Sequence, residues 1–454
     1  MRHLYTWSED RLLGVFTERD DYSIGFEYAD DCKIAISQSL PVVGKTGLQA
    51  PKNYLLNLVP ESDMTLSLLY EERHAPHGDI FGILSNMDTV GGLVFSLTSE
   101  APQLTEDKLT VCSAESIAAQ MDSLSGRELS RRSIPMRFSL AGAQSKFTMS
   151  LVEGTWYASS ASLPSTHIIK IPNSSFSDCD LVENATMDLA AACNVQVARH
   201  GTFEVLGRKA YITERFDRSG IGSWDCKRLH IEDFAQALGV PPSEKYGQTL
   251  EDVVSMIRNV GQGDEIVYEF LNAYMFNAYA GNADAHIKNY SFIYDSGSVK
   301  LSPLYDAVVT AGWPHLDKAL AIPLNDTYFY PEYLTESTWA IFARKAHLDD
   351  GRLVDQAKNM ARMISDKMPE FFSEMNPEYR ENALREMKKN TEAVIHPNLA
   401  IQSQWIPLYE DLSTEIGFDQ LALDAQDASD AYNRTLSHSS STAKRRDGAR
   451  DLDE

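Results

Sequence analysis

The amino-acid sequence predicts an α+β protein of two lobes, preceded by an additional N-terminal α+β subdomain. Residues 137–216 form a β-rich block that one helical stretch interrupts at residues 181–193. Beyond residue 217 the apolar residues recur at helical spacing, most clearly in residues 264–280. The first hundred residues contain short alternating segments of their own. We therefore expect a small subdomain, then a β-rich lobe, then a helical lobe.

The N-terminal subdomain is expected to combine strands with short helical pieces. Residues 14–16 and 22–28 have the pattern of a strand pair with an acidic turn between them. Residues 53–58 and 64–69 are short and amphipathic, and residues 91–95 form an apolar strand that closes the subdomain.

The remaining elements follow in order along the chain. A polar, helix-prone connector at residues 102–132 precedes the β-rich lobe. Apolar runs predict strands at residues 147–151, 166–172, 211–217 and 290–294. Helical spacing returns at residues 352–368, 378–394 and 403–416. The predicted divisions are residues 1–100 for the N-terminal subdomain, 101–216 for the connector and β-rich lobe, 217–416 for the helical lobe and 417–454 for a disordered tail.

Composition limits the classes of function. The 454 residues carry a net charge of −24, and an acidic surface repels nucleic-acid phosphates, so autonomous DNA binding is not expected. The five cysteines contain no CxxC pair and suggest neither a zinc cluster nor a disulfide framework. No run approaches the roughly 18 apolar residues of a membrane span, and the N-terminus lacks the apolar core of a signal peptide. We expect a soluble cytoplasmic protein without membrane association.

The most informative stretch is Gly-Asn-Ala-Asp-Ala-His-Ile-Lys-Asn at residues 281–289, followed by Leu-Tyr-Asp at residues 304–306. It places Asn289 five positions after Asp284, with Asp306 beyond a predicted strand. Phosphoryl transfer from ATP requires one carboxylate to orient the attacking hydroxyl, and an amide oxygen plus a carboxylate to hold Mg²⁺. The base Asp and metal Asn of protein kinases have the same spacing. A polar turn explains each motif alone, but together they favour a kinase.

The β-rich lobe contains candidate residues for binding a nucleotide. Lys170 lies on the apolar strand at 166–172, from which a lysine can reach the α- and β-phosphates. A solvent-facing lysine on an edge strand is the alternative. Glu183, in the helical stretch that follows, is the candidate partner of Lys170. Residues 139–146, Ser-Leu-Ala-Gly-Ala-Gln-Ser-Lys, supply small residues where backbone can approach phosphate, although they form neither a Walker loop nor GxGxxG.

The boundary between the lobes offers a candidate adenine site. Residues 211–217 run from a strand into a polar segment. In kinases this position supplies the backbone groups that read the adenine edge, and a simple domain linker is the competing interpretation. A β-rich lobe, a helical lobe and an Asp/Asn loop early in the second lobe together make up the layout of a two-lobed, protein-kinase-like fold.

These motifs together resemble the HipA family of bacterial serine/threonine kinases, toxins of type II toxin–antitoxin modules. The matches occur in the order of the family. They are Ser-x-Ala-Gly-Ala-Gln-x-Lys at 139–146, Thr-His-Ile-Ile-Lys at 166–170, Val-Glu-Asn at 182–184, Glu-Arg-Phe-Asp-Arg at 214–218, Glu-Asp-Phe-x-Gln at 232–236, Lys-Tyr at 245–246, Asn-x-Asp-x-His-x-Lys-Asn at 282–289 and Leu-Tyr-Asp at 304–306. The resemblance covers roughly residues 10 to 410.

The resemblance implies a role for each matching residue. Asp284 would be the catalytic base, with Lys288 as a second catalytic residue, and Asn289 and Asp306 would bind Mg²⁺. Ser139 matches the serine that such kinases autophosphorylate. The residues implied in ATP binding are Ala141, Gly142, Ala143, Gln144, Ser145, Lys146, Lys170, Glu183, Glu214, Phe216 and His286. One departure is Ala185, which stands where the family often has a second glutamate.

The resemblance also implies partners. Family members act on aminoacyl-tRNA synthetases and are restrained by a small DNA-binding antitoxin of the HipB type. We therefore expect a protein substrate, growth inhibition, and contact with operator DNA only through the antitoxin. A kinase for a lipid or small molecule remains an alternative, because the Asp-x-His-x-Lys-Asn loop is also similar to that of phosphoinositide kinases. A catalytically idle co-repressor is the alternative from a different class.

Overall fold

The computed structural model describes residues 1–61, 63–101, 109–125, 145–172, 176–260, 263–295, 298–324 and 327–396. The chain divides into two units, Met1–Ala400 and Ile401–Glu454. All of the described residues belong to the first unit. The predicted helix at 403–416 and the predicted tail at 417–454 lie outside them.

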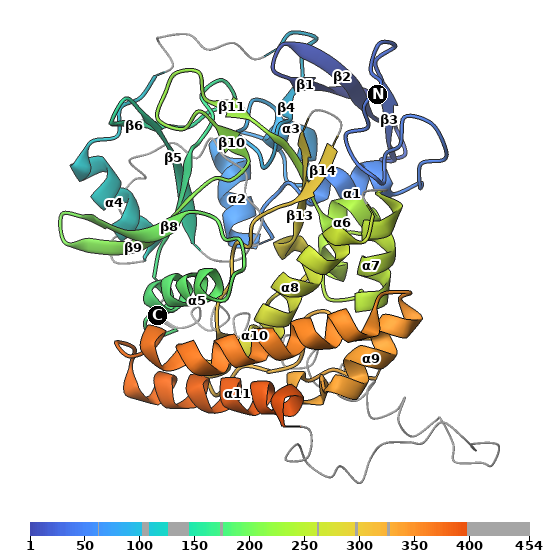
Figure 1. The fold of residues 1–454 in the computed structure, drawn as a ribbon. Coiled ribbons are helices and arrows are strands. Elements are labelled where there is room, and N and C mark those ends of the chain that lie inside the picture. Colours follow the sequence, from blue (N-terminus) through green and yellow to red (C-terminus); the bar gives the residue numbers. More distant parts are fainter. Residues whose placement is uncertain are drawn as a thin grey trace, which may run out of the picture. The chain divides into compact units, whose positions relative to one another are not determined.

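A four-stranded antiparallel sheet of order β3-β2-β1-β4 forms the beginning of the chain (Figure 1). Its strands are β1 (Arg2–Ser8), β2 (Arg11–Glu18), β3 (Ile24–Tyr28) and β4 (Val94–Ser96). Helices α1 (Ala50–Leu56), α2 (Asp63–Glu72) and α3 (Ile80–Leu84) lie between β3 and β4 in the chain. The predicted strand pair and both amphipathic pieces are confirmed. Strand β1, which pairs with β2 along its whole length, was not predicted from the sequence.

A second, five-stranded antiparallel sheet has the order β6-β5-β7-β9-β8. Its strands are β5 (Lys146–Val152), β6 (Thr155–Ala158), β7 (His167–Lys170), β8 (His200–Val205) and β9 (Arg208–Glu214). Helix α4 (Ala114–Leu124) precedes the sheet, and α5 (Cys179–Ala192), the predicted helical interruption, contacts β8 and β9. Buried side chains of this sheet, such as Phe147 and Ile169, share one hydrophobic cluster with the N-terminal sheet. The two sheets therefore contribute to one hydrophobic core.

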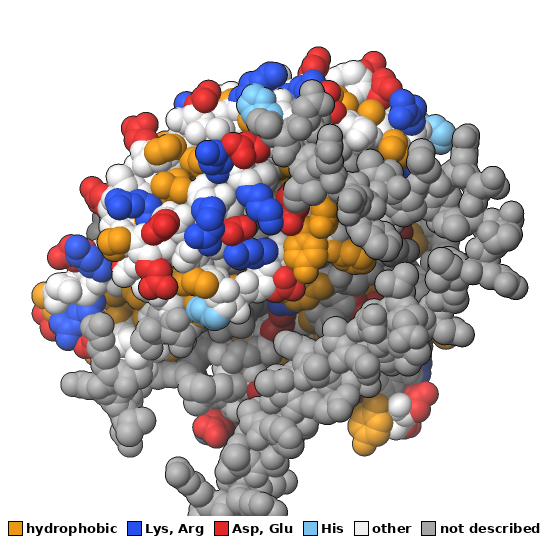
Figure 2. Space-filling view, turned by 90° about the horizontal axis from the view of Figure 1, so that it is seen from below, with side chains coloured by type: hydrophobic (Ala, Val, Ile, Leu, Met, Phe, Trp, Pro, Cys, Tyr) orange, Lys and Arg blue, Asp and Glu red, His pale blue; other side chains and the backbone are white. Residues whose placement is uncertain are grey.

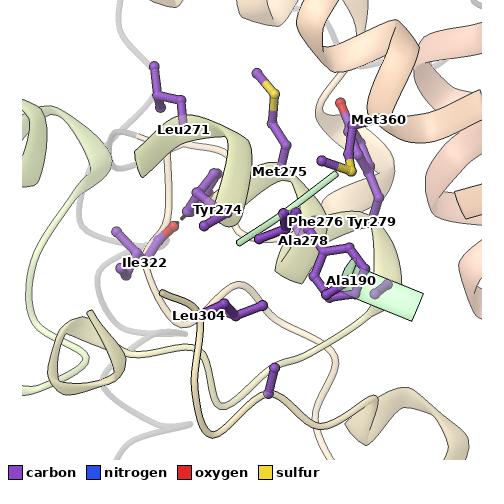
Figure 3. Close-up of a cluster of buried hydrophobic side chains, with 14 of the residues drawn as sticks. Ala190, Leu271, Tyr274, Met275, Phe276, Ala278, Tyr279, Leu304, Ile322 and Met360 are labelled. Carbon is purple, nitrogen blue, oxygen red and sulfur yellow. Dashed lines mark hydrogen bonds between the residues drawn. The ribbon is translucent and has the colours of Figure 1, made fainter. Parts of the chain in front are cut away.

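Helices dominate the rest of the described chain. They are α6 (Phe234–Leu238), α7 (Leu250–Asn259), α8 (Glu265–Ala280), α9 (Glu336–Lys345), α10 (Asp350–Phe371) and α11 (Pro377–Ile395). Helix α8 is central, since its residues are buried on nearly every side. In Figure 3, Met275 and Tyr279 of α8 lie among side chains that include Ala190 of α5 and Met360 of α10. The predicted helices at 264–280, 352–368 and 378–394 are confirmed.

Short strands precede the first helix of this region, where the sequence pattern predicted helix alone. Strands β10 (Arg218–Ser219) and β11 (Lys227–Arg228) pair with each other. Strand β12 (His230–Asp233) forms a three-stranded sheet with two strands that follow α8: β13 (Ser291–Asp295), which confirms the strand predicted at 290–294, and β14 (Ser298–Leu301). Strands of two to four residues are too short to show periodicity, which explains why they were missed. The sheet matters for function, because β13 begins two residues after Asn289 and so fixes the end of the Asp/Asn loop.

The exposed face seen from below carries charges of both signs. Lys and Arg side chains are interspersed with Asp and Glu side chains where this face is described (Figure 2). None of the helices in the described ranges has the length and apolar character needed to span a bilayer.

Candidate active site

Polar side chains fix the shape of the loop that follows α8. Gly281 ends the helix at φ 81°, and a Cβ there would lie 2.7 Å from the Cβ of Ala311. The Asp284 N–H donates to Asn282 Oδ1 (3.1 Å), and Asn289 Nδ2 donates to the Asp284 carbonyl (2.9 Å). The Asp284 side chain is 60% exposed. Its backbone is therefore held firmly while its carboxylate remains accessible.

The segment before Asp306 fixes this second carboxylate. The Leu304 N–H donates to the Gln196 carbonyl (2.7 Å), and the Ala198 N–H donates to the Leu304 carbonyl (2.9 Å). Leu304 is buried against the α8 core, as Figure 3 shows. Asp306 itself adopts φ 57°, a left-handed conformation in which Asp and Asn are enriched. Its Oδ1 accepts a hydrogen bond from Lys170.

Lys170 is a buried cation between two carboxylates. Its Nζ lies 2.5 Å from Glu183 Oε1 and also donates to Asp306 Oδ1. Burial lowers the pKa of Lys170, but Asp306 and Glu183 more than offset this and raise it above its ordinary value. Burial raises the pKa of Asp306, yet Lys170 and Lys146 hold it well below its ordinary value. The predicted pairing of Lys170 with Glu183 is present, and Lys170 also bridges the sheet to Asp306.

Lys146 lies opposite Lys170 on the neighbouring strand, because the two are register partners in the β5–β7 pair. Burial lowers the pKa of Lys146 to about 8; Asp306 opposes this effect and Lys170 adds to it. Like charges directly opposite each other in a sheet repel, so a bound polyanion would relieve this pair. The Ser145 carbonyl accepts from the Ile171 N–H (2.9 Å). The predicted Ser139 and residues 141–144 lie outside the described residues.

The predicted adenine hinge follows β9. The N–H groups of Glu214 and Arg215 are bonded to the carbonyls of Arg199 and Thr166, both at 2.8 Å. Phe216 packs against Tyr305, with ring centroids 5.0 Å apart. In the described part of the chain, no hydrogen bond engages the Phe216 N–H. That N–H can therefore bind the edge of a base, while the Phe216 ring stands beside the residue that precedes Asp306.

Two other predicted residues have different surroundings. The Lys288 side chain is 2% exposed, and its Nζ donates to Asn57 Oδ1 (2.8 Å) and to Asp233 Oδ2 (3.3 Å). These partners tie Lys288, and with it the end of the loop, to the segment after α1 and to β12. His286 is buried, and its Nδ1 is without a hydrogen-bond partner in the described part of the chain. Burial lowers the pKa of His286, while Asp284 opposes this effect.

Three residues of the site have no role predicted from the sequence. Tyr246, quoted only as part of a motif, donates a hydrogen bond from its hydroxyl to Asp284 Oδ1. Asn57 and Glu61 come from the segment after α1, and Glu61 Oε2 lies 2.7 Å from Lys245 Nζ. The Lys245-Tyr246 match was a usable signal. Asn57 is 231 positions from Lys288, and no pattern along the chain connects them.

The oxygen atoms of the site suit Mg²⁺. Asn289 uses its amide nitrogen in the bond to Asp284, so its amide oxygen is the atom that can bind a cation. Together with the Asp306 carboxylate this gives two hard oxygen ligands. Mg²⁺ commonly binds through one or two protein oxygens and completes its shell with waters and substrate phosphates. No cluster of three or more His, Cys, Asp or Glu that could hold a metal occurs in the ranges described.

Comparisons with known proteins also relate this chain to kinases. A family model described as HipA-like C-terminal domain matches residues 138–370. The Sinorhizobium fredii protein Y4mE is 32% identical over 363 residues, which cover 76% of this chain and 86% of that protein. The serine/threonine-protein kinase toxin HipA of Shewanella oneidensis is 27% identical over 360 residues, which cover 75% of this chain and 82% of the toxin.

A solved structure agrees in fold. The complex of HipA, HipB and operator DNA from Shewanella oneidensis MR-1 contains a chain that matches with a TM-score of 0.72 and 24% identity, covering 86% of this chain and 97% of that chain. This likeness confirms the predicted kinase-like α+β fold. With a family model over about half of the chain and a relative above 30% identity over most of it, the protein belongs to the HipA-like family.

Proposed function

We propose that this protein is a serine/threonine-protein kinase that transfers the γ-phosphoryl group of ATP to a hydroxyl of a cellular protein. The observation that carries the proposal is the contact of Lys170 with both Glu183 and Asp306, beside the loop that holds Asp284 and Asn289. Phosphoryl transfer needs positioning and charge stabilisation more than covalent chemistry, and this cluster supplies both.

Each residue has a role in this reaction. Lys170 and Lys146 bind the phosphates, and Asn289 and Asp306 hold the metal. Bound Mg²⁺ would neutralise charge on the β- and γ-phosphates. Asp284 accepts the proton of the attacking hydroxyl. Glu214 and Phe216 hold the adenine edge, and His286 contributes to the ATP site. Lys288 keeps the loop in place through Asn57 and Asp233.

Ser139 is the proposed site of self-inhibition. It directly precedes the small-residue loop at residues 141–146. A phosphate there would add a charge of about −1.5 to −2 beside the ATP phosphates and expel the loop by repulsion. Phosphorylated protein should bind ATP poorly, and Ser139→Ala should remain unmodified. Autophosphorylation that maps only to Ser145 or to the cluster at residues 437–442 would contradict this proposal.

The biological role that we propose is that of a growth-inhibiting toxin. The support is the similarity to the toxin HipA of Shewanella oneidensis, at 27% identity. The substrate is a protein, and an aminoacyl-tRNA synthetase is the candidate implied by the family. Expression of the wild-type protein should slow growth, whereas expression of Asp284→Ala should not. Phosphopeptide mass spectrometry after induction would identify the substrate.

A HipB-like helix-turn-helix antitoxin is the proposed partner. The matching structure contains HipA, HipB and operator DNA, which supports an equivalent assembly here. A net charge of −24 cannot provide the cations that phosphate contacts require, so the antitoxin would supply most of the DNA-binding surface. We expect no operator shift by the protein alone at physiological salt. With the product of the adjacent gene, the operator should shift and growth inhibition should be suppressed. Tight operator binding by the isolated protein would contradict this.

A radiolabel transfer assay tests the central proposal. The purified protein is incubated with γ-labelled ATP, Mg²⁺ and cell lysate, beside Asp284→Ala and the control Asp295→Asn, an exposed residue of the β13–β14 hairpin. Wild-type protein and the control should label protein bands, and Asp284→Ala should not. Label found only in lipid or small molecules would favour the alternative kinase class, and no transfer at all would favour an idle co-repressor.

A further inference from the structure

The hydroxyl of Tyr246 lies where a kinase acceptor would be expected. It donates a hydrogen bond to Oδ1 of Asp284, the carboxylate that in the proposed function accepts the proton of the attacking hydroxyl. A general base must lie within hydrogen-bond distance of the proton that it removes. The protein's own phenol thus makes the contact that an incoming serine or threonine hydroxyl must make.

Several contacts hold the Tyr246 ring in this place. It packs edge-on against His286, with ring centroids 5.2 Å apart and an interplanar angle of 81°. The ammonium group of Lys245 lies 5.3 Å from the ring centroid and is itself paired with Glu61 Oε2 at 2.7 Å. The Ile287 N–H bonds to the Lys245 carbonyl at 3.3 Å. The tyrosine is therefore tied to the catalytic loop on both sides.

The contact is also displaceable. Tyr246 is 48% exposed and the Asp284 side chain is 60% exposed, so solvent and a large acceptor can reach both. Exposed hydrogen bonds contribute little net free energy, because water replaces the lost partner. A protein acceptor with a well-placed hydroxyl can therefore take over the Asp284 carboxylate, whereas water competes with the tethered phenol at a disadvantage.

We propose that Tyr246 is a specificity-determining residue that occupies the acceptor position until a protein hydroxyl displaces it. This inference rests on the proposed function and deepens it. Tyr246 competes with every acceptor for the hydrogen bond to the Asp284 carboxylate. An acceptor that is poorly positioned, such as water, is inhibited most by this competition. The residue thereby limits futile hydrolysis of ATP and favours acceptors whose surface binds around the loop.

The matched substitution is Tyr246→Phe, which removes the hydroxyl and keeps the ring contacts with His286 and Lys245. Tyr333→Phe, at a residue 43% exposed on the 3₁₀ turn Pro331–Tyr333, is the control. Two rates are measured with MgATP: phosphate release without a protein acceptor, and transfer to myelin basic protein, a basic probe that suits the net charge of −24. The KM for ATP is measured in parallel.

Tyr246→Phe should raise phosphate release and lower the KM for myelin basic protein, each by about threefold to tenfold, because one hydrogen bond to a charged group competes at this site. The KM for ATP and the control should not change. The inference is overturned if Tyr246→Phe releases phosphate no faster than active wild-type protein. A fall only in the kcat for transfer to myelin basic protein would also overturn it, because Tyr246 would then serve to position Asp284. If wild-type protein transfers no phosphate to water or protein, the proposed function fails, and this inference with it.

Discussion

Lys170 and Glu183 form a buried ion pair between β7 and α5, with Nζ and Oε1 2.5 Å apart and side-chain exposures of 6% and 1%. The same ammonium group contacts Asp306, whose side chain is 38% exposed. Glu183 therefore shares Lys170 with Asp306, the proposed metal ligand. This division of the lysine between two carboxylates leads to a prediction about each partner.

Glu183→Gln should weaken catalysis without unfolding the protein. The amide removes the charge and keeps the shape, so Lys170 would turn fully to Asp306 and compete with Mg²⁺ for its carboxylate. Since a hydrogen bond to a charged group contributes roughly 1.5–3 kcal/mol, we expect kcat/KM for MgATP to fall by about tenfold or more. Steady-state kinetics on folded protein would measure this. Asp180→Asn, in the first turn of the same helix, is the control, and unchanged kinetics in Glu183→Gln would contradict the assignment.

Asp284→Ala should abolish phosphoryl transfer and leave stability nearly unchanged. Loss of a positioned base costs on the order of 10² to 10⁴ in rate, and the 60% exposure of this side chain means that its removal leaves no buried gap. Single-turnover kinetics and thermal unfolding would measure the two effects. Near-wild-type transfer by the purified variant, with Asp295→Asn as the control, would show that Asp284 is not the base.

Much of the site was predictable because its information is local. Asp284 and Asn289 stand in one short loop, and helical periodicity was sufficient to predict α8, which positions that loop. Lys170 was recognisable as a lone lysine within an apolar strand. In each case the residues that define the feature are close in sequence.

The missed features depend on contacts between distant segments. The resemblance implied a catalytic Lys288, but its bond to Asn57, which spans 231 positions, was not predictable from the sequence. Strand β12 is four residues long and gains its structure from pairing with β13. Tyr246 reaches Asp284 across 38 positions. Such contacts are set by packing, which a single sequence does not reveal.

Asp306→Asn should raise the Mg²⁺ concentration needed for activity. Asparagine tolerates the φ of 57° at this position, so the substitution removes charge without adding backbone strain. A neutral ligand binds a hard cation more weakly. At fixed ATP we expect the Mg²⁺ concentration that gives half-maximal activity to rise about tenfold. Titration with MgCl₂ would measure the midpoint. An unchanged midpoint, with Asp317→Asn as an exposed control, would exclude Asp306 as a metal ligand.

Glu232 should make the protein less stable as the pH rises through neutrality. Burial raises its pKa from 4.5 to about 7, although it accepts hydrogen bonds from Ser37, Tyr294 and Gln38. The folded state therefore holds this proton over a range where the unfolded state has lost it, and stability falls as the pH rises from about 4.5 to above 7. Glu232→Gln should gain about 3 kcal/mol relative to wild type across this range. Urea unfolding at several pH values would measure the difference in the free energy of unfolding between Glu232→Gln and wild type. A difference that does not depend on pH would contradict this prediction. Glu381→Gln, at an exposed position, is the control.

Asp88 should be among the most destabilising positions to substitute. Its buried carboxylate contacts Arg215, Arg218 and Arg228, and thereby ties the segment before β4 to the chain around the proposed adenine hinge. Burial alone raises the pKa of Asp88, but the three guanidinium groups lower it below its ordinary value. Removing one partner of a buried ion pair leaves uncompensated charge and costs about 3–5 kcal/mol.

Asp88→Asn should therefore lower the free energy of unfolding at pH 7 by about 3–5 kcal/mol, measured by urea denaturation. Because the folded pKa of Asp88 is depressed, its contribution is complete above the unfolded value of about 3.9 and is lost as the pH falls through the folded value. The difference in the free energy of unfolding between wild type and variant (the gap) should then narrow in acid. Asp30→Asn, at an exposed position, should show no gap. A gap of less than about 1 kcal/mol at pH 7 would mean that the arginines are held mainly by the carbonyls of Thr89, Gly91 and Ser165, which also accept their hydrogen bonds.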